Sequence, residues 1–186
     1  MATVEQTRVL MTAEEFAMRP DSGAAEELVR GFVVMSPPPG IRHGFVCVRF
    51  AKLLATYVDD NELGCVIGND AGVITERKPD SVRAPDVSFY SFSRLPKGDL
   101  PTGYNAMPPD LACEVLSPGD RRKDVMEKVD EYLKAGVLAV VVLDPDRRTA
   151  HVFEADRPPV ALGPDDVLRL ERILPGFEVV VGKLFG

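Results

Sequence analysis

Glu114 occupies the position in this sequence that most needs a chemical explanation. It interrupts the apolar run "LACEVL", Leu111 to Leu116, and such a run is typical of a central strand covered on both faces. An ionised carboxylate there is costly unless it is paired, hydrogen-bonded or bound to a metal. The sequence therefore predicts a compensated glutamate, held either by a basic side chain or by a cation.

Two further acids lie at the starts of predicted strands. Asp86 follows Pro85, and Glu27 follows Glu26. Taken singly, Asp86 is an ordinary turn or edge aspartate, and the Glu26-Glu27 pair is an ordinary solvated face. If the long connection between their strands brings Asp86 and Glu114 side by side, however, the two carboxylates suffice for one Mg²⁺, which prefers oxygen ligands and keeps several waters. Such a site suits phosphodiester hydrolysis.

Other catalytic systems find little support. The chain has only His43 and His151 as histidines, and it contains neither a G-x-S-x-G motif nor a glycine-rich phosphate loop. Its three cysteines, Cys47, Cys65 and Cys113, are odd in number and lack C-x-x-C spacing, which argues against a disulfide framework and a zinc cluster. We expect them to be small core residues.

Composition indicates one globular domain spanning residues 1–186. The 186 residues are 45% hydrophobic and 27% charged, enough for a core in a chain of single-domain length. No apolar run has the length of a membrane helix, and the acidic start has no signal-peptide pattern, so we expect a cytoplasmic protein without membrane contact. The net charge of −7 opposes nucleic-acid binding unless a local basic surface or bound cations offset it.

The front half of the chain predicts short elements around one long helix. We expect residues 1–11 to form an N-terminal arm. A capping box, Thr12 with Glu15, opens a short helix that Pro20 should close. Further elements are predicted from apolar periodicity and turn residues: a hairpin in Glu27–Met35 turning at Arg30-Gly31, a helix from His43 past Val58, and strands in "CVIGND", "GVITER" and "VRAPDVSFY".

The back half predicts a crossover between parallel strands. The strand Leu111–Leu116 precedes a helix that Asp120 would cap and Gly136 would end, and "VLAVVVLD" forms the next buried strand. Residues 91–109 are predicted to form a long surface loop, "TAHVFEA" a strand and "LPGFEVVV" a last strand. The predicted fold is mixed α/β, with a mixed central sheet flanked by helices.

Several segments in order carry a family resemblance. They are Glu27-Leu28 with Gly31, "VVMSPPPGIRHG", "VRAPDVSF", "PDLACEVLSPGDRRKDVMEKVDEYLKAGV", "VVVLDP" and "LPGFEVVV". Together they resemble the Uma-two-type family of restriction endonucleases, part of the PD-(D/E)xK nuclease superfamily, over roughly Thr12 to Phe185. The resemblance implies a restriction-endonuclease-like core, dependence on a divalent metal and DNA as substrate.

The resemblance also implies roles for individual residues. Asp86 and Glu114 match the metal ligands, and Glu27 matches an acid that orients a water or a second ion. The superfamily lysine stands two positions after the glutamate, where this chain has Leu116. The family pattern offers Lys128 on the following helix instead.

Helix geometry leaves two interpretations of Lys128. At about 100° per residue, it flanks the predicted buried stripe of Val125 and Val129, so its long stem can reach the sheet edge. The alternative is an ordinary helix-surface pair with Asp124, four residues earlier.

Several lysine and arginine side chains are expected to form a basic surface for the DNA backbone. Lys52 and Lys123 are additional candidates for this surface. Any single lysine or arginine on a protein surface is ordinarily just solvated. The main candidates are Arg42, His43, Arg49, Arg121 and Arg122. His43 has three alternatives: contact with a phosphate, support of Glu27, or simple capping and packing.

The sequence thus predicts a Mg²⁺-dependent DNA endonuclease, with Mn²⁺ as an alternative ion. Two other classes stay open: a non-catalytic nucleic-acid-binding or dimerisation module on the same fold, and a metal-dependent hydrolase of a smaller phosphodiester, which the acidic charge favours. A homodimer is expected, because two related sites are the simplest way to cut both strands of a duplex.

Overall fold

A computed structural model describes residues 10–20, 22–98 and 100–186. The predicted arm therefore lies outside the described residues, except for positions 10 and 11. The helices are α1 (Ala13–Ala17), α2 (Ile41–Asp60), α3 (Arg122–Ala135) and the 3-10 turn η1 (Val181–Leu184). The strands are β1 (Ala25–Val29), β2 (Phe32–Ser36), β3 (Gly64–Gly68), β4 (Val73–Glu76), β5 (Ser81–Arg83), β6 (Val87–Ser91), β7 (Leu111–Val115), β8 (Ala139–Asp144), β9 (Thr149–Glu154), β10 (Arg157–Leu162), β11 (Val167–Leu170) and β12 (Leu174–Val180).

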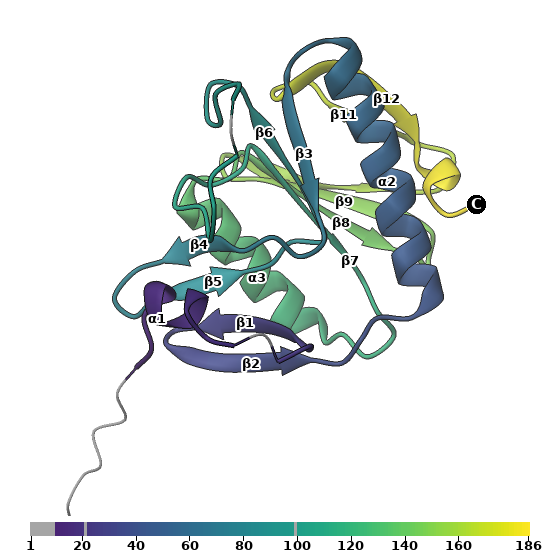
Figure 1. The fold of residues 1–186 in the computed structure, drawn as a ribbon. Coiled ribbons are helices and arrows are strands. Elements are labelled where there is room, and N and C mark those ends of the chain that lie inside the picture. Colours follow the sequence, from purple (N-terminus) through teal and green to yellow (C-terminus); the bar gives the residue numbers. More distant parts are fainter. Residues whose placement is uncertain (1–9, 21, 99) are drawn as a thin grey trace, which may run out of the picture.

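The strands form a central mixed sheet and two smaller sheets. The central sheet has the order β10-β9-β8-β7-β6-β3, in which β7 and β8 are parallel and the other neighbours antiparallel. A second sheet has the order β2-β1-β5-β4, and β11 pairs with β12 in a third. Figure 1 shows α2 against one face of the central sheet and α3 behind it. The predicted mixed α/β class is confirmed.

The α2 side of the central sheet holds the larger core. Val46, Phe50, Leu54 and Val58 recur every four residues along α2 and are fully buried, as expected of one helical stripe. They join alternate side chains of β6, β7 and β8 and the apolar residues of β11, β12 and η1 in one cluster. This layer fixes the position of the α2 N-terminus beside the sheet edge.

The α3 side has a smaller apolar cluster and completes the predicted crossover from β7 to β8. Val129 and Tyr132 of α3 pack on Ala112, Val140 and Val142. Helix α3 ends at Gly136, which has the left-handed φ of 98° that glycine adopts without strain.

The predicted helix cap at Asp120 is wrong. Arg121 is the N-cap residue and supplies no side-chain cap. Asp120 instead accepts a hydrogen bond from the backbone N–H of Ser117, because the "SPGD" segment folds into a turn of its own before the helix begins.

The predicted capping box and hairpin are both present. Thr12 and Glu15 cap α1 reciprocally, and the β1–β2 turn has Arg30 and Gly31 at φ of 49° and 81°. A Cβ on Gly31 would lie 2.6 Å from the Cβ of Leu10, so this position requires glycine for two reasons. The hairpin places Glu27 in β1.

One strand prediction needs correction, and the predicted last strand lies in a separate sheet. The segment "VRAPDVSFY" is not one strand, because Pro85 breaks the ladder and divides it into β5 and β6 of different sheets. The last strand, β12, pairs with β11 outside the central sheet. Between β6 and β7, residues 92–98 and 100–110 form neither helix nor strand apart from a bridge at Asn105. Among the described residues, no helix is long and apolar enough to span a membrane.

Candidate active site

The four predicted site residues come from four separate elements and line one cleft. Glu27 lies in β1, Asp86 directly before β6, Glu114 in β7 and Lys128 in α3. The cleft measures about 400 Å³. Its remaining walls include residues 36–40, from the last residue of β2 to the start of α2, and residues 117–120, between β7 and α3.

Lys128 connects two of the acids. Its Nζ lies 3.0 Å from Oε1 of Glu27 and 3.2 Å from Oε2 of Glu114. The alternative partner, Asp124, instead pairs with Arg121 at 2.9 Å. Lys128 therefore reaches Glu114 of the central strand β7 and Glu27 of β1, and it does not pair with Asp124 in this structure.

Glu114 is a buried carboxylate with two polar partners. Besides the Lys128 ammonium, the Tyr132 hydroxyl donates a hydrogen bond of 2.7 Å to its Oε1. Burial, aided by the nearby charges of Asp86 and Glu27, outweighs the Lys128 charge and raises the pKa of Glu114 to about 7. The partners predicted for the Glu114 carboxylate are thus present. They offset its charge only in part, as expected where several carboxylates share one ammonium group.

The charge of Lys128 itself is strongly favoured. Burial opposes the ammonium, but the carboxylates of Glu114 and Glu27 outweigh it and hold the pKa of Lys128 above its usual range. The same lysine, with Arg83, overcomes burial and keeps the pKa of Glu27 low. Lys128 and Glu27 are therefore both charged at neutral pH.

Asp86 is placed by the β6–β7 pairing. The antiparallel ladder ends at the pair Val87 and Cys113, so Asp86, directly before β6, lies just beyond the last paired residue, next to the end of β7 that carries Glu114. Its Oδ2 accepts a hydrogen bond of 2.6 Å from the backbone N–H of Val115. Asp86 and Glu114 both line the cleft, and their sharing of one ion stays a prediction.

His43 contacts Asp86 and not Glu27. Its Nε2 lies 3.3 Å from Oδ1 of Asp86, and its Nδ1 lies 3.4 Å from Sγ of Cys47. The hydrogen bond with Asp86 is the main cause that raises the pKa of His43 to about 10. Burial raises the pKa of the Cys47 thiol.

Arg83 anchors Glu27 from within the protein. This buried guanidinium donates from Nη1 to Oε2 of Glu27 at 2.9 Å and binds both oxygens of Glu131 at 2.6 and 2.7 Å. The backbone N–H of Ala84 donates to the other Glu27 oxygen at 3.1 Å. Because both Glu27 oxygens have fixed donors, the carboxylate has one defined orientation.

Sequence reasoning missed four residues of this network: Arg83, Tyr132, Glu131 and Asp70. Tyr132 follows Lys128 by one helical turn, and this spacing was a usable signal. Asp70 lines the cleft from a turn with φ of 55°, and burial, then Asp86, raises its pKa. Only the pairing of distant strands brings Arg83 and Asp70 to the acids, so no local pattern reveals them.

The predicted basic residues lie outside the lining of the cleft, except for His43. Arg42 pairs with Asp146 at 2.8 Å, and Arg49 donates to the carbonyl of Lys183. Arg122 is exposed at the start of α3, beside the exposed Arg121. Arg42 and Arg121 each directly adjoin a cleft segment, so both can be reached by a ligand larger than the cleft.

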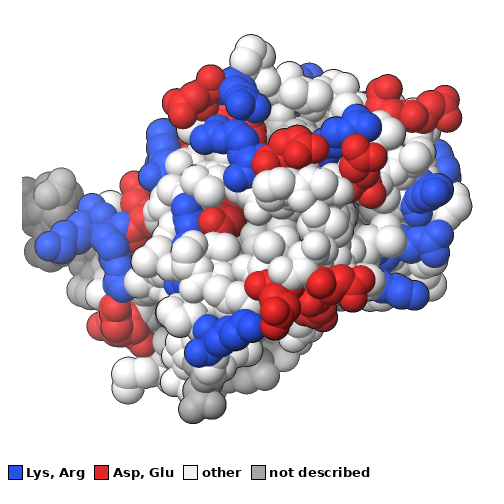
Figure 2. Space-filling view, turned by 90° about the horizontal axis from the view of Figure 1, so that it is seen from above, with Lys and Arg blue, Asp and Glu red and all other residues white. Residues whose placement is uncertain are grey.

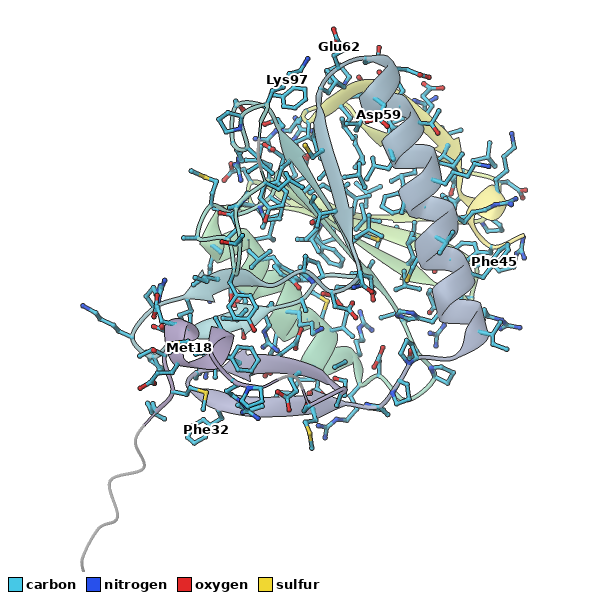
Figure 3. The ribbon with its side chains drawn as sticks, viewed as in Figure 1. Met18, Phe32, Phe45, Asp59, Glu62 and Lys97 are labelled. Carbon is cyan, nitrogen blue, oxygen red and sulfur yellow. The ribbon has the colours of Figure 1, made fainter. Side chains whose placement is uncertain are left out.

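On the face of the molecule that Figure 2 shows, the acidic side chains do not form one continuous patch. There, basic and acidic side chains are mixed. Glu62 and Lys97, at the top of Figure 3, form an ion pair of 3.1 Å. The net charge of −7 opposes nucleic-acid binding overall, but positive and negative side chains balance each other locally on this face.

Comparison with known proteins identifies the family. Residues 13–182 match the model of the Uma2 family, described as "Putative restriction endonuclease". A solved structure from Anabaena variabilis ATCC 29413, described as a "putative nuclease", is 21% identical, covers 94% of this chain and 97% of its own, and has a TM-score of 0.81. No curated protein matches significantly. The cleft of carboxylates thus lies in a fold shared with that Anabaena variabilis protein, and the chain belongs to the Uma2 family.

Proposed function

We propose that this protein is a Mg²⁺-dependent DNA endonuclease of PD-(D/E)xK type whose lysine is supplied by helix α3. The observation that carries the proposal is the position of Lys128, with its ammonium between Glu114 and Glu27. An orthodox motif would place this amine two residues after Glu114. Here the helix delivers it to the same acids.

The donor set fits a hard divalent cation. Asp86 and Glu114 would hold the ion, because they come from the neighbouring ends of β6 and β7 and both line the cleft. The raised pKa of Glu114 shows that its charge is only partly offset, and carboxylate oxygens are the ligands that Mg²⁺ prefers. When bound, a divalent cation polarises the scissile phosphate and acidifies water.

Lys128 acts as an electrostatic donor to the phosphate. Its pKa is raised by the two carboxylates, so the amine keeps its proton at neutral pH and is a poor general base. A fixed positive charge beside the cleft stabilises the negative charge that develops on the phosphate oxygens in the transition state. The raised pKa of Lys128 disfavours a role for this lysine in generating hydroxide.

Glu27 orients the reacting groups. Arg83 and the Ala84 N–H fix its carboxylate, and Lys128 Nζ contacts it at 3.0 Å. Glu27 therefore holds the ammonium in place and offers a charged acceptor to water that enters the cleft. The substrate backbone would be met outside the cleft by Arg42, Arg49, Arg121 and Arg122, and a homodimer would present two such sites.

A metal titration with supercoiled plasmid as substrate tests this function. We expect cleavage to require Mg²⁺ or Mn²⁺, to stop with EDTA, and to return when the ion is added back. Metal binding without cleavage of plasmid but with hydrolysis of small phosphodiesters would favour the hydrolase alternative. Neither metal binding nor cleavage would favour the non-catalytic module and contradict the proposal.

A further inference from the structure

His43, Cys47 and Asp86 form a second group of metal-binding atoms at the edge of the cleft. His43 and Cys47 lie one helical turn apart on α2, so their side chains project to the same side. Asp86 meets them from the start of β6. One ligand atom from each residue lies within 4.8 Å of the other two.

The contacts within the group have the length that separates two ligands of one metal ion, although they involve both ring nitrogens of His43. Sγ of Cys47 is 3.4 Å from His43 Nδ1, and Oδ1 of Asp86 is 3.3 Å from His43 Nε2. Zinc bonds of about 2.0 to 2.3 Å separate tetrahedral ligands by roughly 3.3 to 3.6 Å. Because each partner faces a different ring nitrogen, a single ion requires rotation of the imidazole or the thiol. The side chains of His43 and Asp86 are only 11% and 14% exposed, which favours a protected site.

The mixture of donors selects the kind of ion. Imidazole, thiolate and carboxylate together suit Zn²⁺ or Co²⁺, whereas Mg²⁺ prefers oxygen alone. We propose that His43, Cys47 and Asp86 bind one borderline transition-metal ion such as Zn²⁺, with a fourth position open to water. Binding releases the thiol proton to solvent, because the thiolate is the ligand. The absence of C-x-x-C spacing does not exclude this site, because its third ligand comes from a distant strand.

Metal binding at this group should affect nuclease activity, because Asp86 belongs to both sites. The same carboxylate is assigned above to the Mg²⁺ site, so occupation by Zn²⁺ withdraws a ligand from the nuclease centre. Zn²⁺ should therefore inhibit in competition with Mg²⁺. This consequence rests on the proposed function, whereas the binding site itself does not.

Cobalt binding to the full chain tests the site directly. We expect Co²⁺ to bind at one equivalent with a near-ultraviolet thiolate charge-transfer band, and Zn²⁺ to displace it. Cys47→Ser should remove the band and weaken binding by a factor on the order of 10 or more. Cys65→Ser is the matched control, because Cys65 is also a partly buried free cysteine but lies outside the group, and it should keep both. An unchanged band in Cys47→Ser, or no band in the unmodified protein, would overturn the proposal.

Two further measurements separate this site from the nuclease centre. Glu114→Gln should leave the cobalt band unchanged, because Glu114 is not a ligand of this group; loss of the band would contradict the assignment. In plasmid cleavage, Zn²⁺ should inhibit Cys65→Ser about as strongly as the unmodified protein and Cys47→Ser roughly tenfold less strongly; equal inhibition of all three would contradict the competition. A cobalt band without any cleavage would support this site and refute only the proposed function.

Discussion

The two faces of the central sheet serve different purposes, although they are made by alternate residues of the same strands. Among the described residues, the α2 face has a cluster of 21 buried apolar side chains, against six on the α3 face. Cys113 belongs to the first cluster, while its neighbour Glu114 contacts Lys128 and Tyr132 of α3. The larger core stabilises the sheet, so the smaller face can retain buried charges at a cost in stability.

Asp86 lies where the two faces meet, and its loss should have the largest effect on activity. Asp86→Asn should abolish plasmid cleavage, because a neutral amide is a poor ligand for Mg²⁺. We chose asparagine because alanine would leave the buried Val115 N–H without its acceptor, at a cost of about 1–3 kcal/mol. The checks are a cleavage assay and a thermal melt, and full activity in the folded variant would exclude Asp86 from the mechanism.

Lys128 should contribute the next largest effect. Lys128→Ala should lower the cleavage rate by about 10²- to 10³-fold, the usual loss for one electrostatic donor, with a smaller change in DNA binding. Lys134→Ala is the control on the same helix, since Lys134 pairs with Asp130 away from the cleft. Single-turnover rates and binding isotherms, measured below the melting temperature of each variant, make the comparison. A wild-type rate in folded Lys128→Ala would contradict the proposed lysine.

Tyr132 tests the buried polar network of the α3 face. Tyr132→Phe keeps the packing and removes the hydrogen bond to Glu114, which we expect to raise the pKa of Glu114 further and to weaken Mg²⁺ binding about tenfold. A hydrogen bond to a charged group is worth about 1.5–3 kcal/mol, so stability should also fall. Isothermal titration with Mg²⁺ distinguishes the two effects. Lower stability with unchanged affinity would mean that the hydroxyl only supports the fold.

The pH dependence of stability offers a smaller, separate test on the same face. Burial raises the folded-state pKa of Glu114 from 4.5 to about 7, so its contribution to stability is fully present below pH 4.5 and is lost as pH rises through 7. Mg²⁺ binds the ionised form, so its stabilising effect should grow over the same range. Melting temperatures of the metal-free and Mg²⁺-loaded protein from pH 5 to 8 measure this. Glu114→Gln should remove the Mg²⁺ effect, and persistence of the effect would assign the binding elsewhere.

The contrast between the faces also explains what the sequence could predict. Local patterns identified the α2 stripe, the Arg30-Gly31 turn and the anomaly of Glu114, because each depends on neighbours within a few residues. The break at Pro85 was missed, because residues of high strand propensity, Val82 and Val87 to Tyr90, stand on both sides of it. Arg83 could not be assigned at all, because its partners Glu27 and Glu131 lie 56 and 48 residues away.

Leu116 provides the smallest and most specific test of the relocated lysine. It follows Glu114 by two residues, and it packs partly buried against the α3 cluster, on the face where Lys128 lies. In the Lys128→Ala background, Leu116→Lys places an amine on the strand beside the same acids, so we expect recovery of about tenfold in cleavage rate, a fraction of the original loss. Full recovery is not expected, because Leu116 contributes to the α3 cluster and a desolvated ammonium there costs stability. Leu116→Met in the same background is the control for packing and should restore nothing. Equal rates for the lysine and methionine variants, with both folded, would show that an amine on the strand cannot replace the one on the helix.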